Sequence, residues 1–452
     1  MVVLDVTIVN VALPSMRSSL GLSANGQQWV INAYTLTFAG FLLLGGRAAD
    51  LFGRRRVFLS GLAVFTLFSL LGGLAQNGAS LIAARAVQGI GGAILAPATL
   101  SLITTTFTDP AARRKALGAW SATAASGAAT GVLVGGILTD LLDWRWVLFV
   151  NVPIGAVLIA ASAFVLSESR AEQRPRLDIA GAVTVTGGLA LLVYGIVSTD
   201  TRAWTSAATI LTLLSATVLL GAFIVIESRV AHPLAPLAVF RRRSVSAANG
   251  IAVTIGAALF GMYFFLSLYL QQVNGYGPLK AGAAFLPAGL STMVGALTGT
   301  RLMSHLGVRR QLVLGPVIAA VGLIWLSQVS AGDAYLGHVF GPLVLSGIGI
   351  GLSFVPMTVA ATADVPVHQA GLASGLINTT RQIGGAVGLA TMATVAAGAS
   401  SAASGDDRAF LISAGALVVG ALLALALPGK PKPERHITSG EEIAEPIVVV
   451  EA

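Results

Sequence analysis

Residues 45–56 read Gly-Gly-Arg-Ala-Ala-Asp-Leu-Phe-Gly-Arg-Arg-Arg and separate two apolar stretches, each about long enough to cross a bilayer. Asp50 lies in this basic turn beside four arginines: Arg47, Arg54, Arg55 and Arg56. Lys and Arg next to apolar spans are retained on the inner side of a membrane, so the turn predicts a cytoplasmic loop. Two interpretations stay open: a hairpin that only sets the topology, and a hinge whose Asp50 and arginines exchange partners as two helices move.

The composition predicts a polytopic membrane protein. The chain has 452 residues, of which 55% are hydrophobic and 10% are charged, and its mean hydropathy is +0.84. A soluble protein carries about 25% charged residues. Cysteine is absent, which excludes disulfides and thiolate chemistry. The net charge of +8 is distributed over loops between apolar spans, so no nucleic-acid partner is expected.

Fourteen apolar stretches predict an all-α protein with fourteen membrane-spanning helices, because a helix needs about 20 apolar residues to cross a bilayer. The predicted spans are 1–14, 27–48, 57–76, 80–107, 116–139, 146–167, 179–199, 206–227, 246–270, 280–303, 312–330, 338–362, 371–399 and 408–427.

The basic residues predict the orientation. When the loop after Pro14 is placed outside, the inner loops and tail collect twenty Lys and Arg and the outer loops five. This bias predicts that both termini are cytoplasmic and, for a bacterial protein, that the chain lies in the inner membrane. The first span is short: fourteen residues at 1.5 Å each reach about 21 Å of a core of about 30 Å. A start upstream of Met1 is the favoured explanation, and a stub of helix the alternative.

The chain also repeats itself. Glycines and neighbouring residues of the first half recur about 255 residues later in the same order, as in Gly45, Arg47 and Gly53 with Gly299, Arg301 and Gly307. We therefore expect two homologous six-helix halves, 1–167 and 246–427, with two inserted helices in 168–245 and a polar cytoplasmic tail, 428–452. Repeats in the same orientation are typical of transporters whose halves rock about a site near the midplane.

Three charged residues lie inside predicted spans and away from the span ends. Asp5 is the one acidic residue clearly within a span, and Arg85 and Arg381 are the two basic ones. A charge near the bilayer centre costs about 2.5–3.5 kcal/mol on insertion scales and therefore usually marks function. The alternative is that Asp5, in a short first helix, is interfacial and solvated.

Other residues have weaker signals. Four glycines in span 116–139 permit close approach of helices, either for packing alone or for transport: Gly127, Gly131, Gly135 and Gly136. Polar and aromatic candidates for lining a cavity are Asn10, Tyr34, Gln88, Asn378 and Arg381, although Tyr34 also fits an aromatic belt at the interface. The five histidines lack the spacing of metal ligands, and neither a nucleotide-binding loop nor a catalytic arrangement is present, so neither a metal site nor an enzyme is expected.

With these motifs in view, the chain resembles the major facilitator superfamily, and in particular its fourteen-span drug:proton antiporter branch. The resemblance rests on residues 45–56 and on five further stretches: Leu4–Pro14, Arg85–Ala93, Trp144–Trp146 with Asn151–Pro153, Gln271–Tyr276 and Ser374–Gln382. It covers essentially the whole chain.

The resemblance implies roles for the matched positions. Asp5 takes part in proton or cation coupling, and Arg85 is linked to proton transfer. Gly46, Asp50, Gly53 and Arg54–Arg56 form a conformational latch. One position departs from the family: the antiporter motif usually reads Gly-Pro-x-x-Gly-Gly, and here Val132 replaces the proline.

The function expected from this resemblance is proton-coupled export of lipophilic drugs, cationic or neutral, across the plasma membrane by alternating access. The partners would be small drug-like substrates, protons and membrane lipid, with a monomer as the working unit. No cofactor is expected, because the proton gradient supplies the energy. The alternatives are a narrow-specificity exporter of an endogenous metabolite or antibiotic in the same fold and, from another class, a channel-like facilitator, a membrane-embedded enzyme or a sensor.

Overall fold

A computed structural model describes residues 1–107, 109–169, 177–200, 202–231, 233–330, 332–363, 365, 370–399 and 401–428. Over these residues the chain is helical and contains no strand, which confirms the predicted all-α class. Most of the predicted tail, 428–452, and part of the linker after residue 169 lie outside the described residues.

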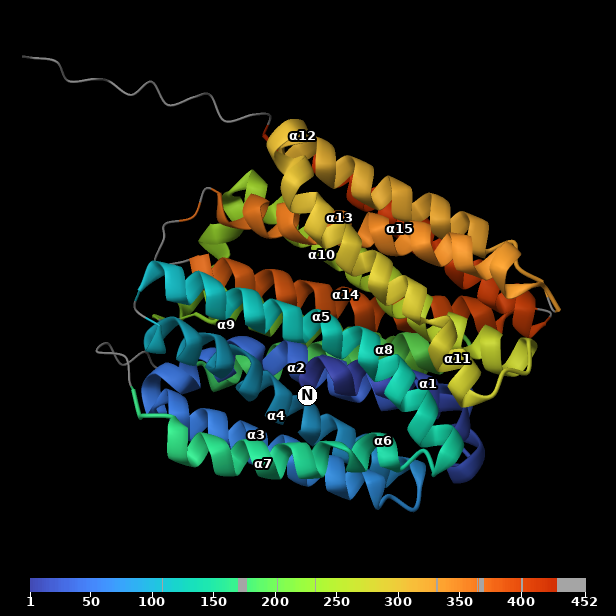
Figure 1. Cartoon of the computed structure of the whole chain (residues 1–452), viewed down its shortest axis with the longest axis horizontal. Helices are drawn as coiled ribbons and strands as arrows, with labels where there is room; N and C mark the ends of the chain where they lie inside the picture. Colours follow the sequence, from blue (N-terminus) through green and yellow to red (C-terminus); the bar gives the residue numbers. More distant parts are fainter. Residues whose placement is uncertain are drawn as a thin grey trace, which may run out of the picture.

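The helices follow one another with short connections (Figure 1). They are α1 (Val2–Leu20), α2 (Ala24–Phe52), α3 (Arg54–Gly73), α4 (Gly78–Thr106), α5 (Pro110–Leu141), α6 (Trp146–Phe149), α7 (Asn151–Val165), α8 (Ile179–Val197), α9 (Ala207–Arg229), α10 (Arg243–Leu268), α11 (Pro278–Ala284), α12 (Leu286–Leu326), α13 (Gly341–Thr362), α14 (Ala370–Ala397) and α15 (Ala402–Leu425). Polar caps begin several of them: the side chains of Ser23, Asn77 and Asp109 accept hydrogen bonds from the first turns of α2, α4 and α5.

Ten helices of the described part of the chain are long and apolar enough to cross a membrane. Every predicted span falls on a helix. Two predicted spans, 280–303 and 312–330, both fall on the stretch formed by α11 and α12. These two are separated by a kink at Gly307, whose φ is 76°. The count of fourteen spans therefore stays a prediction.

The prediction that the first helix ends at Pro14 is wrong. α1 continues to Leu20, a length of 19 residues or about 28 Å. Proline has no N–H and normally disrupts a helix because the carbonyl four residues earlier loses its donor. Here that carbonyl, of Asn10, accepts a hydrogen bond of 2.8 Å from the Ser267 hydroxyl on α10. A contact from the second half of the chain thus replaces the hydrogen bond that the proline removes from α1.

The helices form two groups that meet along several helices (Figure 1). In the first, α1 packs on α5, and α4 packs on both α2 and α3. In the second, α10 packs on α14 and α15, and α12 packs on α13. The groups touch where α5 contacts α11 and where α2 contacts α14. A further helix, α8, packs on α9 and contacts both α2 and α14, so it also joins the two groups.

The sequence repeat is also a repeat of packing. A Cβ atom at Gly91 would collide with the backbone of Phe65, and one at Gly349 would collide with the backbone of Ala319. Phe65 and Ala319 are 254 residues apart, close to the spacing of the repeated motifs. The backbone conformation at the two turns is repeated as well. Gly53 and Gly307, which are 254 residues apart, both have positive φ, 107° and 76°.

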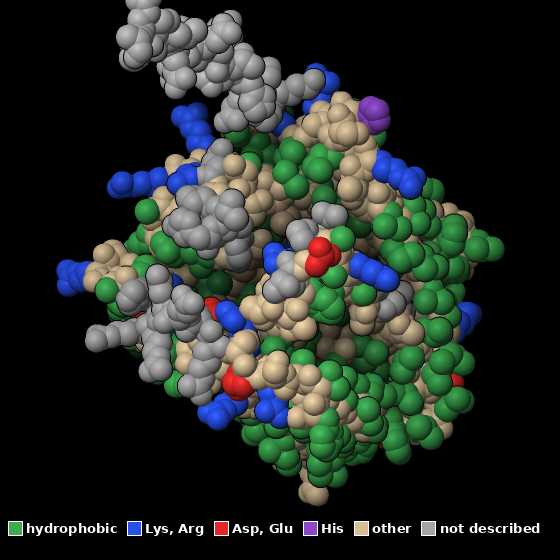
Figure 2. Space-filling view, turned by 60° about the vertical axis from the view of Figure 1, so that its left-hand side comes forward, with side chains coloured by type: hydrophobic (Ala, Val, Ile, Leu, Met, Phe, Trp, Pro, Cys, Tyr) green, Lys and Arg blue, Asp and Glu red, His purple; other side chains and the backbone are tan. Residues whose placement is uncertain are grey.

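Large apolar side chains cover the outside of the molecule, as a lipid-facing surface requires. Val218 on α9 is 68% exposed and Phe164 on α7 is 91% exposed. Figure 2 shows hydrophobic side chains over the flank, while Lys and Arg side chains gather around the end that comes forward in that view.

Candidate functional site

An ion pair is buried between α1 and α4. The Asp5 carboxylate lies 2.5 Å from Nη1 of Arg85, and the side chains are 0% and 2% exposed. The alternative that Asp5 is interfacial and solvated is therefore wrong. Each charge offsets the cost of burying the other, and removing either would leave an uncompensated ion inside the protein.

Two amide side chains complete the shell around Asp5. Gln88 on α4 and Asn151 on α7 both donate to Oδ1 of Asp5, each at 2.9 Å. Gln88 also accepts a hydrogen bond of 2.7 Å from Nη1 of Arg85. All four side chains are buried, and we call them the Asp5 cluster. The carboxylate thus accepts three hydrogen bonds from three different residues.

A second layer holds the Asp5 cluster in place. Nε of Arg85 donates to the Val30 carbonyl on α2 at 3.2 Å, and its guanidinium lies 4.3 Å from the centre of the Tyr34 ring. Asn151 donates to the Ser69 hydroxyl at 3.1 Å, and Ser69 in turn donates to a backbone carbonyl of α6. Helices α1, α2, α3, α4 and α7 therefore meet at one charged centre.

The predicted cavity residues fall in three places. Tyr34 and Gln88 belong to the surroundings of Asp5, as described. Asn10 donates to the Val6 carbonyl of its own helix at 2.8 Å. Asn378 and Arg381 pair with each other on α14 at 2.7 Å, and the contacts described for this chain do not join them to Asp5.

The residues of the predicted latch lie together at one end of α2 and α3. Asp50, near the end of α2, accepts a hydrogen bond of 2.9 Å from Nη2 of Arg54, the first residue of α3. Gly53 separates the two helices, with φ 107°. Arg55 donates to the Ala163 carbonyl at the end of α7. Gly46 faces Pro97 of α4, where a Cβ would lie 3.5 Å from the proline ring.

Glu168 caps this turn, and the sequence did not single it out. Its carboxylate accepts hydrogen bonds of 3.2 Å from the backbone N–H groups of Arg55 and Arg56, the first residues of α3. A carboxylate is favoured there because the start of a helix has unpaired N–H groups and a positive end of its dipole. A Cβ at Gly53 would lie only 2.5 Å from the Glu168 carboxylate, so this cap needs glycine.

The glycines of α5 lie against two different helices. Gly131 and Gly135 face α1, where an added Cβ would collide with the side chain of Thr7 and with the Ile8 carbonyl. Gly136 faces α11, and a Cβ there would lie 2.6 Å from the Pro278 carbonyl. Gly127 is less crowded, with its nearest neighbour at 3.7 Å. The geometry thus gives three of the four glycines a packing contact.

Further acidic residues are buried that the sequence analysis did not single out. Glu227 on α9 is 3% exposed, and its carboxylate accepts from the backbone N–H groups of Leu234 and Ala235. Asp178 caps α8 through the N–H of Gly181 at 2.7 Å. Asp406 is 5% exposed because α15 begins at Ala402, six residues before the predicted span. The sequence analysis missed these three residues because they lie at the ends of predicted spans, where charged residues are ordinary.

An all-helical chain with an apolar exterior, repeated packing and a buried ion pair among its spans defines a multi-pass membrane transporter. Residues 1–389 match the model of the Major Facilitator Superfamily, and the chain belongs to that family. It is similar to the cephamycin export protein CmcT of Amycolatopsis lactamdurans, with 46% identity over 87% of this chain and 82% of that protein.

Other relatives are named for resistance to an antibiotic. The puromycin resistance protein pur8 of Streptomyces alboniger is 42% identical over 89% of this chain and 80% of its own length. The lincomycin resistance protein of Streptomyces lincolnensis is 32% identical over 98% and 91%. Among solved structures, a peptide transporter POT in complex with sulfate has a TM-score of 0.68 at 16% identity, covering 94% of this chain and 91% of that one, which shows a shared fold. The resemblance to the drug-export branch is confirmed.

Proposed function

We propose that this chain exports lipophilic drugs, cationic or neutral, across the bacterial inner membrane in exchange for protons. The halves 1–167 and 246–427 would alternate access to the substrate, with the helices of 168–245 inserted between them and both termini in the cytoplasm. The observation that supports this proposal is the Asp5 cluster, because a buried carboxylate paired with arginine can exchange a proton for a cation.

In the proposed cycle, the substrate enters from the cytoplasm and displaces a proton from Asp5. The halves rock, the drug leaves on the outer side, and a new proton binds Asp5. Protonation would remove the charge that holds Arg85, so Gln88 and Asn151 would have to take part in the rearrangement. The turn of Asp50, Gly53 and Arg54–Arg56 would act as the latch, and the three crowded glycines of α5, Gly131, Gly135 and Gly136, as a close-packed pivot.

The driving force depends on substrate charge. If one proton exchanges for one monovalent cation, only the pH gradient does work, about 1.4 kcal/mol per pH unit. A neutral drug would also use the membrane potential, about 2.3 kcal/mol per charge per 100 mV.

The test is ethidium export from cells that express this chain, with and without a protonophore. We expect export that the protonophore abolishes in the unmodified protein and that is lost in Asp5→Asn. The Asp140→Asn variant, an exposed acid on α5, serves as the control and should export normally. Export by Asp5→Asn that still depends on pH would remove Asp5 from the scheme.

The names of the relatives favour a second candidate, a narrow-specificity exporter of one antibiotic. Two of the most similar proteins are named for a single compound, cephamycin or puromycin. Competition distinguishes the candidates. Unrelated lipophilic compounds inhibit each other's export by a multidrug protein, whereas a narrow exporter responds only to close analogues of one antibiotic.

A further inference from the structure

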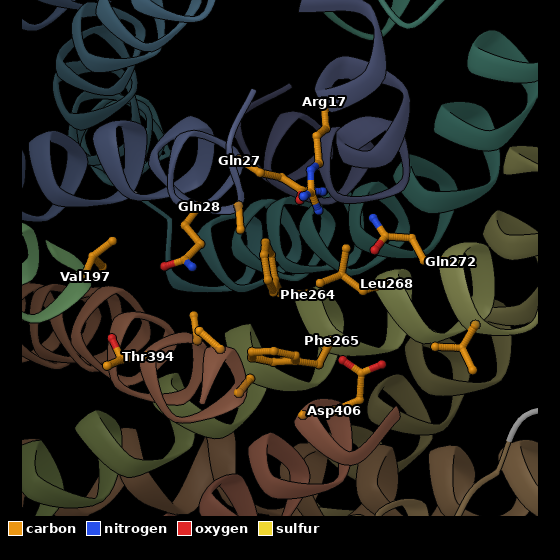
Figure 3. Close-up of a pocket in the computed structure, with 16 residues that line it drawn as sticks. Arg17, Gln27, Gln28, Val197, Phe264, Phe265, Leu268, Gln272, Thr394 and Asp406 are labelled. Carbon is orange, nitrogen blue, oxygen red and sulfur yellow. The ribbon is translucent and has the colours of Figure 1, made fainter. Parts of the chain in front are cut away.

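A cavity that is separate from the Asp5 cluster lies between the two groups of helices. Its volume is about 190 Å³, and residues of α1, α2, α8, α10, α14 and α15 line it. Figure 3 shows Arg17 and Gln27 on one side, Asp406 on the opposite side, and Phe264 and Phe265 between them. In the proposed orientation the cavity lies at the outer end of the molecule.

Several polar groups that line this cavity are buried without a protein partner. Among the described residues, no hydrogen bond satisfies Nε2 of Gln27, Oε1 of Gln28 or Oδ2 of Asp406. These side chains are only 1%, 8% and 5% exposed. A buried polar atom without a partner costs about 1–3 kcal/mol, so three of them at one cavity indicate a ligand or ordered water that fills it.

The charges of the cavity are separated. Arg17 makes no ion pair within the described part of the chain, and Asp406 makes none either. One wall therefore offers a guanidinium and the amide N–H of Gln27, while the other offers a carboxylate. The Phe264 and Phe265 rings, 3% and 2% exposed, supply an apolar surface between the two charges.

We propose that this cavity binds zwitterionic amphiphiles: compounds with a carboxylate that lies at Arg17, an apolar body on Phe264 and Phe265, and a protonated amine at Asp406. The proposal deepens the exporter function and rests on it, since the site would hold the substrate, or its charged end, at the outer side before release. At about 190 Å³ the cavity is smaller than the roughly 300–1,000 Å³ of sites for whole drugs, so it fits one ring with its charged groups.

Binding to the purified protein in lipid nanodiscs tests the site without any substitution. Isothermal titration compares four probes that share one aromatic ring: 4-(aminomethyl)benzoic acid, benzylamine, benzoate and benzyl alcohol. Two charge-assisted contacts predict that the zwitterion binds at least about tenfold more tightly than either singly charged compound. Equal affinity for all four probes, or no binding of any of them because water alone fills the cavity, would overturn the proposal.

Two variants then assign the charges. Asp406→Asn should lower the affinity for the zwitterion and for benzylamine by about tenfold and leave benzoate unchanged. Arg17→Gln should lower the affinity for the zwitterion and for benzoate by about tenfold and leave benzylamine unchanged. Asp140→Asn is the matched control and should bind like the unmodified protein. If Arg17 and Asp406 instead pair with each other when the outer end closes, both variants will lower export of every compound equally and keep the order of affinities, which rejects the site.

Ethidium export measured in parallel separates this proposal from the function it rests on. Proton-coupled export without charge-selective binding would overturn the zwitterion site and keep the exporter. Charge-selective binding without proton-coupled export would keep the site and reject the proton-driven cycle.

Discussion

The Asp5 carboxylate on α1 and the Arg85 guanidinium on α4 form an ion pair of 2.5 Å in which neither side chain is more than 2% exposed. The two residues are 80 positions apart, and the pair is completed by amide groups of α4 and α7. Each charge is therefore held in place by the other, and the stability of the protein should depend on keeping or removing them together.

We predict that Asp5→Asn and Arg85→Gln each destabilise the protein by about 3–5 kcal/mol, because each leaves one buried charge without a partner. The double variant should recover most of that loss, since it removes both charges and keeps two side chains able to form hydrogen bonds. Thermal unfolding of the four proteins in detergent measures this coupling. Single variants as stable as the double variant would contradict it.

A second prediction concerns the cap of α3. Gly53→Ala should cost about 1–3 kcal/mol through its positive φ and, in addition, displace the Glu168 carboxylate that lies where the new methyl group would be. Gly307→Ala is the matched control, because it has a positive φ but no atom of the described residues within 4 Å of the new methyl group.

Gly53→Ala should lower the free energy of unfolding by about 1 kcal/mol more than Gly307→Ala does, because that is the usual contribution of a helix cap. In a Glu168→Ala background the difference should disappear, because no cap is left to displace. A difference that persists in this background would mean that Glu168 is not the cause. Denaturant unfolding of the set gives the comparison.

A third prediction concerns Pro14. Ser267→Ala should leave the Asn10 carbonyl without a donor and weaken the contact between α1 and α10 by about 1–3 kcal/mol. Because α1 and α10 belong to different halves, the population in which the outer ends separate should increase. In a Pro14→Ala background, where an N–H is restored within α1, Ser267→Ala should have little effect.

The chain has no cysteine, so spin labels on introduced cysteines at the outer ends of α1 and α10 report this distance without background. Longer distances in Ser267→Ala alone are the expected result. Equal distances in the two backgrounds would show that the proline does not create the need for Ser267.

A fourth prediction separates the glycines of α5. Gly136 and Gly282 lie face to face where α5 meets α11, and a Cβ at Gly282 would lie 2.5 Å from the Val132 carbonyl. Gly136→Ala and Gly282→Ala should therefore force the halves apart at this contact and slow transport. Gly127→Ala, whose new methyl group would lie 3.7 Å from its nearest neighbour, should transport normally. If Gly127→Ala is as slow as Gly136→Ala, crowding at the contact is not the reason.

The sequence predicted the all-α class and identified Asp5 and Arg85 as exceptional, because a charge inside an apolar helix is visible in any linear reading. It did not predict Asn151 as a site residue or Ser69 at all, because small polar residues are common near helix ends and their role depends on which helices meet. Glu168 was missed for a similar reason: it lies just beyond a predicted span, and its use as a cap requires the end of α7 to reach the start of α3. Ending the first helix at Pro14 followed the ordinary rule for proline, which fails because the donor from α10 is 257 residues away.

The turns at the two positive-φ glycines, Gly53 and Gly307, are held by different kinds of contact. The turn at Gly53 is tied to α7 through Glu168, whereas the equivalent turn at Gly307 has no neighbour within 4 Å of its Cβ position among the described residues. The Gly307 joint is held differently: Nε2 of Gln311, just after the kink, donates to the Gly299 carbonyl before it and to the Leu352 carbonyl of α13. One copy of the duplicated joint thus depends on a carboxylate that reaches it from the end of α7, and the other on a buried amide that bridges its own kink, so a change of charge at the membrane surface should loosen the N-terminal joint and leave the C-terminal one unaffected.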